Sequence, residues 1–275
     1  MNHHKELRSQ TETRHVLRWQ AGGAVRRVCD ELAAEEPLEV QVDTQPVVVT
    51  MRTPGHDDEL AAGFLLTEGL IHSRGDILKI IPYARNSSGN VIDVFLAPHV
   101  QVDFERLRRH VFASSSCGLC GKVTIKSVHQ QFKKVRSEMK VPLRVLLGLA
   151  GQLRGAQAGF DASGGLHAAA VFNARGRLLV AREDVGRHNA VDKVLGFGLL
   201  NELLPFDRHI LMVSGRASFE IMQKALAARI PVVAAVSAPS SLAVQFAVES
   251  RQTLVGFVRE DRFNVYSRPE RIRLK

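Results

Sequence analysis

The chain has 275 residues, of which 45% are hydrophobic, and 37 Lys and Arg against 28 Asp and Glu give a formal net charge of +9. This apolar content is enough for a packed core in one or two domains, which excludes a disordered protein. No apolar leader and no apolar run of about 20 residues is present, so we expect a cytoplasmic protein with no membrane partner. The positive balance favours an anionic partner, although the low aromatic content of 6% makes nucleic acid a poor candidate.

The first part of the chain is predicted to be rich in strands. "PLEVQVD" and "PVVVTMRT" flank a turn at Thr44 and Gln45 and predict a hairpin. "TPGHDDELAAGFLLTEGLI" predicts a helix, because Pro54 and several acids stand at its start. A second hairpin is predicted within "IIPYARNSSGNVIDVFLA", and a short charged helix near "DFERLRRH".

Cys117 and Cys120 lie in "SSSCGLCGK", a run of small and flexible residues. A structural zinc site requires four ligands, of which the cysteine pair supplies two. A zinc deaminase requires a Pro directly before the cysteine pair, but Ser116 precedes Cys117, and "HDDE" does not fit the His-x-Glu motif of those enzymes. A thioredoxin-like pair would open a helix after a strand. The flanks instead indicate a mobile loop with a reactive thiol, whose thiolate Lys122 would favour, while an accidental pair remains the alternative. Cys29 is expected to be an inert packing residue.

The second part of the chain predicts a parallel sheet. "VPLRVLLGLAGQLRGAQ" indicates an amphipathic helix, and the following segment reads as strand, turn, strand and a helix from about Gly186. From His209 onward, apolar runs of strand length alternate with helical patterns, which is typical of a βαβαβ unit with right-handed crossovers.

Two similar turns, "VSGRAS" and "VSAPSS", follow strands of this unit. They contain Ser214, Arg216 and Ser237, and we expect them to lie side by side at the carboxyl edge of the sheet, where helix starts bind anions. The alternative is that these small residues simply form the turns. His167, flanked by small apolar residues, is either a satisfied buried histidine or a side chain that faces the pocket.

Five segments in order are similar to the signature blocks of one family. They are "SSCGLCGK", "SGGLHAAAVF", "AREDVGRHNAVDKVLG", "SGRASFEIMQKALAARIPVVAAVSAPSSLAVQFA" and "LVGFVREDRFNVYS". Together they resemble the FdhD family, the formate dehydrogenase accessory sulfurtransferases, over nearly the whole chain.

The resemblance implies a sulfur carrier for formate dehydrogenase, with a cytidine deaminase-like fold and no zinc chemistry. Sulfur from a cysteine desulfurase would form a persulfide on Cys117, with Cys120 as its neighbour. It would then pass to the molybdenum cofactor, in its bis-molybdopterin guanine dinucleotide form, before insertion into formate dehydrogenase. A cytoplasmic homodimer is implied. The family's cofactor-binding stretch corresponds to Phe257, Val258, Arg259, Glu260, Asp261 and Arg262, where "RED" departs from a glycine-containing version.

We therefore expect an α/β protein with a strand-rich subdomain at 1–112, a mobile cysteine loop at 113–122 and an α/β cofactor-binding domain at 123–275. Ser214, Arg216, Ser237 and His167 join the predicted cofactor site, and no resident metal is expected. A guanine-nucleotide or molybdenum-cofactor chaperone with incidental cysteines is the competing interpretation.

Overall fold

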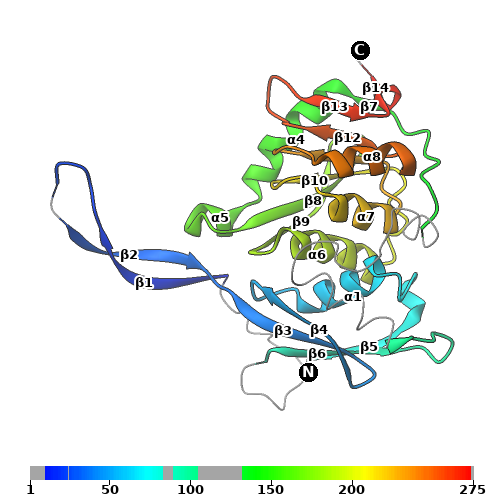
Figure 1. Cartoon of the computed structure of the whole chain (residues 1–275), viewed down its shortest axis with the longest axis horizontal. Coiled ribbons are helices and arrows are strands. Elements are labelled where there is room, and N and C mark those ends of the chain that lie inside the picture. The colour runs from blue at the N-terminus through cyan, green and yellow to red at the C-terminus, as the bar shows by residue number, and fades with distance from the viewer. Residues whose placement is uncertain (1–9, 24, 83–88, 105–131, 274–275) are drawn as a thin grey trace.

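The computed structural model describes residues 10–23, 25–82, 89–104 and 132–273. It consists of a body with two large sheets and a short two-stranded one, and of a long two-stranded arm that projects from the body (Figure 1). Cys117 and Cys120, the predicted cysteine loop and nearly all of the predicted charged helix near residue 105 lie outside the described residues.

The larger sheet has six strands in the order β13-β12-β11-β10-β8-β9. Strands β10, β11 and β12 are parallel and alternate with helices α7 and α8, so the predicted βαβαβ unit is confirmed. The strands β8, β9 and β13 run antiparallel to their neighbours. The elements are β8 (His167–Asn173), β9 (Leu178–Asp184), α6 (Arg187–Leu200), β10 (His209–Val213), α7 (Phe219–Ala227), β11 (Val232–Ala235), α8 (Ser241–Ser250), β12 (Thr253–Gly256) and β13 (Asn264–Ser267).

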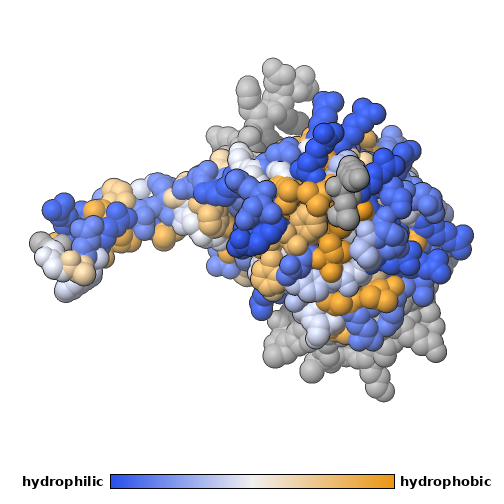
Figure 2. Space-filling view, turned by 90° about the horizontal axis from the view of Figure 1, so that it is seen from above, coloured by the Kyte–Doolittle hydropathy of each residue, from blue (hydrophilic) through white to orange (hydrophobic). Residues whose placement is uncertain are grey.

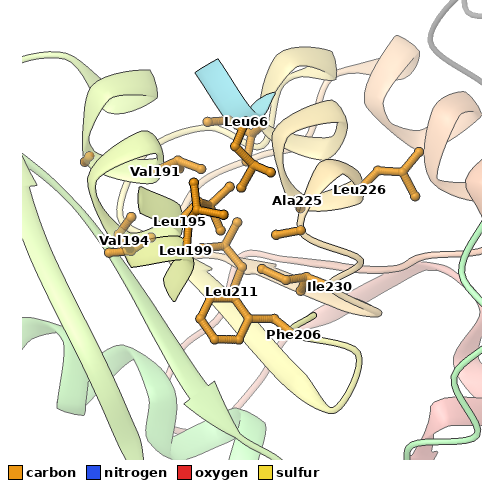
Figure 3. Close-up of a cluster of buried hydrophobic side chains, with 14 of the residues drawn as sticks. Leu66, Val191, Val194, Leu195, Leu199, Phe206, Leu211, Ala225, Leu226 and Ile230 are labelled. Atoms are coloured by element: carbon orange, nitrogen blue, oxygen red, sulfur yellow. The ribbon is translucent and has the colours of Figure 1, made fainter. Parts of the chain in front are cut away.

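Helices cover both faces of this sheet because its strands are apolar on both sides. On one face, Leu211 and Val233 pack with residues of α6, α7 and α8, and Figure 3 shows part of this cluster. On the other face, Ile210 and Val232 pack against α4 (Leu143–Gly155). Such near-continuous apolar strands are typical of sheets buried between helices. Strands β7 (Val141–Pro142) and β14 (Ile272–Arg273) form a short parallel pair. Strand β7 directly precedes α4, and β14 follows the 3-10 turn η2 (Pro269–Arg271).

The smaller sheet has four strands in the order β4-β3-β6-β5. Both predicted hairpins are present as antiparallel pairs, and the first turns at Asp43 and Thr44, which have positive φ. The predicted helix is α1, preceded by a left-handed His56. The elements are β3 (Glu36–Val42), β4 (Gln45–Arg52), α1 (Asp57–Thr67), η1 (Arg74–Asp76), β5 (Ile77–Pro82) and β6 (Val91–Leu96).

Helices α1 and α6 join the two sheets through a contact between their backbones. A Cβ atom added to Gly63 of α1 would lie 1.9 Å from the carbonyl oxygen of Asp192. One added to Gly196 of α6 would lie 1.8 Å from the carbonyl oxygen of Glu59. Glycine is required at both positions, because any side chain would force the helices apart. One hydrophobic cluster consequently runs from Leu38 and Val94 of the smaller sheet through both helices to the larger sheet.

The arm, strands β1 (Thr11–Arg18) and β2 (Arg26–Ala33), was not among the expected elements. It pairs over its full length and contacts α5 (Ala158–Ser163) at its base. The expectation that Cys29 is a packing residue is wrong, because the side chain is exposed on β2. Most of its neighbours on the arm are exposed as well, so the arm has no core in which Cys29 could pack.

The α/β fold class is confirmed. The division at 1–112, 113–122 and 123–275 stays a prediction, as does the likeness to cytidine deaminases. Residues of the first and third ranges share one hydrophobic cluster. Within the described residues, none of the helices is long and apolar enough to cross a membrane.

We predict that Gly63→Ala lowers the free energy of unfolding by about 3 kcal/mol, since the added methyl group meets backbone atoms that cannot move independently. Gly148→Ala is the matched control. This exposed glycine lies within α4, and a Cβ atom added to it would lie 3.9 Å from Nε2 of Gln152, so alanine should stabilise by about 0.5 to 1 kcal/mol. Urea unfolding followed by circular dichroism measures both. Equal stability of Gly63→Ala and the parent chain would contradict the close crossing.

Candidate functional site

The two turns predicted to form a site do lie side by side at the carboxyl ends of β10 and β11. The Ala217 N–H donates to the Ala238 carbonyl at 3.2 Å, and the Ser240 N–H donates to the Ala217 carbonyl at 3.0 Å. Ala217 and Pro239 form an isolated parallel bridge. Each turn ends at a serine N-cap, Ser218 for α7 and Ser240 for α8, so the two helix starts are neighbours at one edge. Helix starts present backbone N–H groups that favour anions.

Ser214 and Ser237 contribute to this edge in different ways. The Ser214 hydroxyl accepts a hydrogen bond from the Ala168 N–H at 2.9 Å, and its own N–H donates to the Ala168 carbonyl at 2.9 Å. Ser214 therefore binds the first turn to the start of β8. The carbonyl of Ser237 accepts a hydrogen bond from the Phe257 N–H at 3.2 Å, which places the predicted cofactor-binding stretch against the second turn.

The stretch from Phe257 to Arg262 divides into inward and outward residues. Val258 is fully buried and its N–H donates to the Ala235 carbonyl at 3.0 Å. The Arg259 guanidinium donates to the carbonyl of Val236 at 2.7 Å. These contacts hold the stretch against β11, although Arg259 itself remains exposed.

The remaining members of the stretch are exposed. Phe257 has a left-handed backbone (φ 54°) and is 41% exposed. Arg262 and Asp261 form an exposed ion pair at 3.2 Å. A Cβ atom added to Gly151 of α4 would lie 3.8 Å from a carboxylate oxygen of Glu260, so Glu260 is directed toward α4. Phe257 and Arg262 are thus the members best placed to meet a ligand.

His167 lies next to the first turn, together with Arg187. A Cβ atom at Gly215 would stand 3.4 Å from Nδ1 of His167 and 3.6 Å from Cβ and Cδ of Arg187, so the glycine leaves room for both side chains. Burial lowers the pKa of His167 below 6.5, and the positive charges of Arg187, His188 and Arg216 lower it further. The imidazole is therefore neutral at pH 7 within a positively charged cluster.

Arg187 and His188, at the start of α6, were not among the predicted site residues. The Arg187 Nε is buried without a hydrogen-bond partner in the described part of the chain. His188 Nε2 lies 2.7 Å from a carboxylate oxygen of Glu220 and 3.4 Å from the Ser218 hydroxyl. The dense run of ionisable residues in "EDVGRHNAVDK" was the signal for them.

A buried ion pair fixes the turn that presents Arg187. Asp184 and Lys193, both fully buried, lie 2.7 Å apart. The Asp184 carboxylate also accepts the N–H of Gly186 at 2.8 Å and the N–H of Thr53 at 3.2 Å. Lys193 donates to the Thr53 carbonyl at 2.8 Å. Thr53 follows β4, so the smaller sheet helps to hold the start of α6.

Comparison with known proteins identifies the family. The family model of the FdhD/NarQ family matches residues 33–273. The chain belongs to the FdhD/NarQ family. "Sulfur carrier protein FdhD" of Mycolicibacterium paratuberculosis is 50% identical over 269 residues, covering 95% of this chain and 98% of that protein. The protein of the same name from Streptomyces coelicolor is 48% identical over 273 residues, with 96% of both chains covered.

A solved structure supports the fold of this family member. The crystal structure of a putative formate dehydrogenase accessory protein from Desulfotalea psychrophila superposes with a TM-score of 0.78. It covers 96% of this chain and all of that one at 24% sequence identity. Among the described residues no group of three His, Cys, Asp or Glu side chains could hold a metal ion, and both family cysteines lie outside those residues.

The contact between His188 and Glu220 predicts a pH effect on stability. The hydrogen bond from His188 lowers the pKa of Glu220 below 4.5, against the opposing effect of burial. Because the folded pKa is the lower one, the stabilisation is complete above about pH 4.5 and is lost as the pH falls through the folded value. Glu220→Gln should therefore flatten the fall in unfolding free energy between about pH 5 and 3.

Urea unfolding at a series of pH values measures this effect. Glu202→Gln, an exposed position after α6, is the control and should leave the pH profile unchanged. An unaltered profile in Glu220→Gln would show that His188 does not stabilise the ionised carboxylate.

Proposed function

We propose that this chain is a sulfur carrier that serves formate dehydrogenase. It accepts sulfur from a cysteine desulfurase as a persulfide on Cys117 and passes it to the molybdenum cofactor in its bis-molybdopterin guanine dinucleotide form. The names of the relatives support the sulfur carrier role. The observation that carries the acceptor is the cationic edge formed by Arg187 and Arg216, with the neutral His167 close to both, beside two helix starts.

The persulfide step needs a nucleophilic thiolate. The Cys117 thiolate attacks the terminal sulfur of the donor's persulfide, one S–S bond forms, another breaks, and the donor cysteine leaves as a thiolate. No net oxidation takes place, so no further oxidant is required. Cys120 would position or accept sulfur as the second thiol of the pair.

The acceptor is strongly anionic, because each guanine dinucleotide half carries a pyrophosphate. A buried Arg187 Nε without a described partner and an exposed Arg216 are suited to phosphate oxygens. Exposed Phe257 offers a ring on which a guanine can stack, and Arg262, which is paired with Asp261 at the surface, adds a third cation from the same edge. Phosphate oxygens placed among these cations would gain charge-assisted hydrogen bonds, which a neutral ligand would not provide.

The same proposal includes the expected cellular setting. The chain would act in the cytoplasm as a homodimer, with a cysteine desulfurase as donor and formate dehydrogenase as the final recipient. The cofactor is cargo that the chain holds while sulfur is transferred.

We predict that incubation with a cysteine desulfurase and cysteine adds the mass of one sulfur atom to Cys117. Cys117→Ala should lose this mass gain and the activation of formate dehydrogenase, with unchanged folding, while Cys29→Ala should keep both. Intact mass and peptide mapping are the measurements. A chain that binds nucleotide but never gains sulfur would favour the cofactor chaperone instead.

A further prediction concerns the cationic edge. Arg216→Ala and Arg262→Ala should each weaken GDP binding about tenfold or more, because charge-assisted hydrogen bonds to phosphate contribute roughly 1.5 to 3 kcal/mol. Arg175→Ala, an exposed position in the turn between β8 and β9, is the control and should bind as the parent chain does. Calorimetry measures the affinities. If neither variant changes the affinity, the nucleotide binds elsewhere.

A further inference from the structure

The arm is a projecting ribbon with little of its surface covered. Its two strands have eight residues each and a reach of about 27 Å. Figures 1 and 2 show it extending from the body, with hydrophobic and hydrophilic residues interleaved along it. Leu17 is 62% exposed and Trp19 is 77% exposed. A lone two-stranded ribbon is marginally stable in water and its outer edges can accept another strand, so the arm needs a partner.

The charges of the arm are separated along its length. Near the base, Glu12 and Glu31 are acidic, and near the tip Arg18, Arg26 and Arg27 are basic. In the middle, Arg14 and Asp30 occupy opposite positions and carry opposite charges, so this part of the arm has no net charge. The ribbon is therefore negative at the end next to the body and positive at the free end.

This arrangement is self-complementary about the centre of the arm. His15 and Cys29 are cross-strand partners. Arg18 and Glu12 are each three residues from His15, on opposite sides of it. Arg27 and Glu31 are each two residues from Cys29. A two-fold axis beside the His15–Cys29 pair would therefore bring the basic tip of one arm alongside the acidic base of another.

We propose that the arm pairs with the arm of a second copy of this chain, side by side and antiparallel, about a two-fold axis near His15 and Cys29. The contact between a tip and the partner's base then occurs twice in the dimer by symmetry. An acidic protein of another kind would match Arg26 and Arg27 but would repel Glu12 and Glu31, so the charges favour a second copy. The proposal gives the expected homodimer a surface and does not depend on sulfur transfer.

The charged side chains can exchange partners on pairing. Within one arm, Glu12 contacts Arg14 at 2.7 Å, and Arg18 lies 3.5 Å from Asp30. These contacts are about half exposed, so each contributes little on its own. Arg26 and Arg27 form no ion pair with another described residue, and both are exposed. The tip is thus the end with uncompensated charge.

The test uses two charge-reversal variants of the full chain, studied by sedimentation velocity under reducing conditions at low salt. Arg26→Glu with Arg27→Glu makes both ends of the arm acidic and lowers the net charge by four, from +9 to +5. Glu12→Lys with Glu31→Lys makes both ends basic and raises the net charge by four, from +9 to +13. Each variant alone should dimerise at least about tenfold more weakly than the parent chain, because every tip then repels every base.

An equimolar mixture of the two variants is the decisive sample. Acidic tips then meet basic bases and basic tips meet acidic bases, so a one-to-one heterodimer should form although both chains carry net positive charge. Arg175→Glu with Arg177→Glu, in the exposed turn between β8 and β9, also has a net charge of +5 and should dimerise as the parent does.

Three results would overturn the proposal. A parent chain that stays monomeric would exclude any homodimer. A parent dimer that neither arm variant weakens would place the interface elsewhere. Two variants that weaken the dimer but do not associate when mixed would exclude tip-to-base pairing. None of these results bears on persulfide formation at Cys117. The sulfur carrier role is tested separately, by the mass gain after incubation with a cysteine desulfurase.

Discussion

The contact between the backbones of α1 and α6 is the constraint on which the rest of this molecule depends. Gly63 and Gly196 allow the two helices to touch without side chains between them. The smaller sheet packs behind α1 and the larger sheet behind α6, so the contact sets the distance between the two halves of the core. It also fixes α6 itself, whose first turn carries Arg187 and His188 to the carboxyl edge of the larger sheet.

Buried ion pairs around these helices explain why the cationic edge keeps its charge. The acids nearest to the helices are already engaged: Asp184 is bound to Lys193, and Asp192 is bound to Lys224 at 2.8 Å. Burial lowers the pKa of Lys224, but Asp192 and Glu68 outweigh it and hold that pKa above 10.5. Asp184 and Asp192 are committed in this way, whereas Glu220, which lies 2.7 Å from His188, also interacts with Arg187. Arg216 forms no ion pair with another described residue and is the cation that stays most available to a ligand. Removing one member of such a pair would leave the other charge buried without a partner, which is strongly destabilising.

The sequence allowed the elements with a strong hydrophobic pattern to be predicted. Strands β10, β11 and β12 are continuous apolar runs, and the repeated "VSGRAS" and "VSAPSS" turns indicate a shared edge from the sequence alone. The inward direction of Val258 and the role of Arg259 in bonding Val236 depend on a tertiary contact with β11, which no local pattern encodes. The approach of Arg187 to Gly215 likewise depends on a contact between segments that are separated in the sequence.

The arm escaped prediction for a different reason. Its strands alternate charged, polar and apolar residues without a buried face, so neither the period of two nor the apolar content indicates a strand. The close contact of α1 with α6 could not be predicted either, because Gly63 stands in an ordinary helical pattern. The residue that requires a glycine there, Asp192, is 129 residues away in the sequence. Features that depend on a distant partner are those that a single sequence conceals.

The position of Trp19 has a practical consequence for spectroscopy. It is the single tryptophan of the chain and lies at the exposed end of the arm, far from the hydrophobic clusters of the body. Its indole is surrounded by water in the folded monomer as it would be in the unfolded chain. Its fluorescence would therefore change little when the core unfolds. It would change instead when a partner covers the tip of the arm.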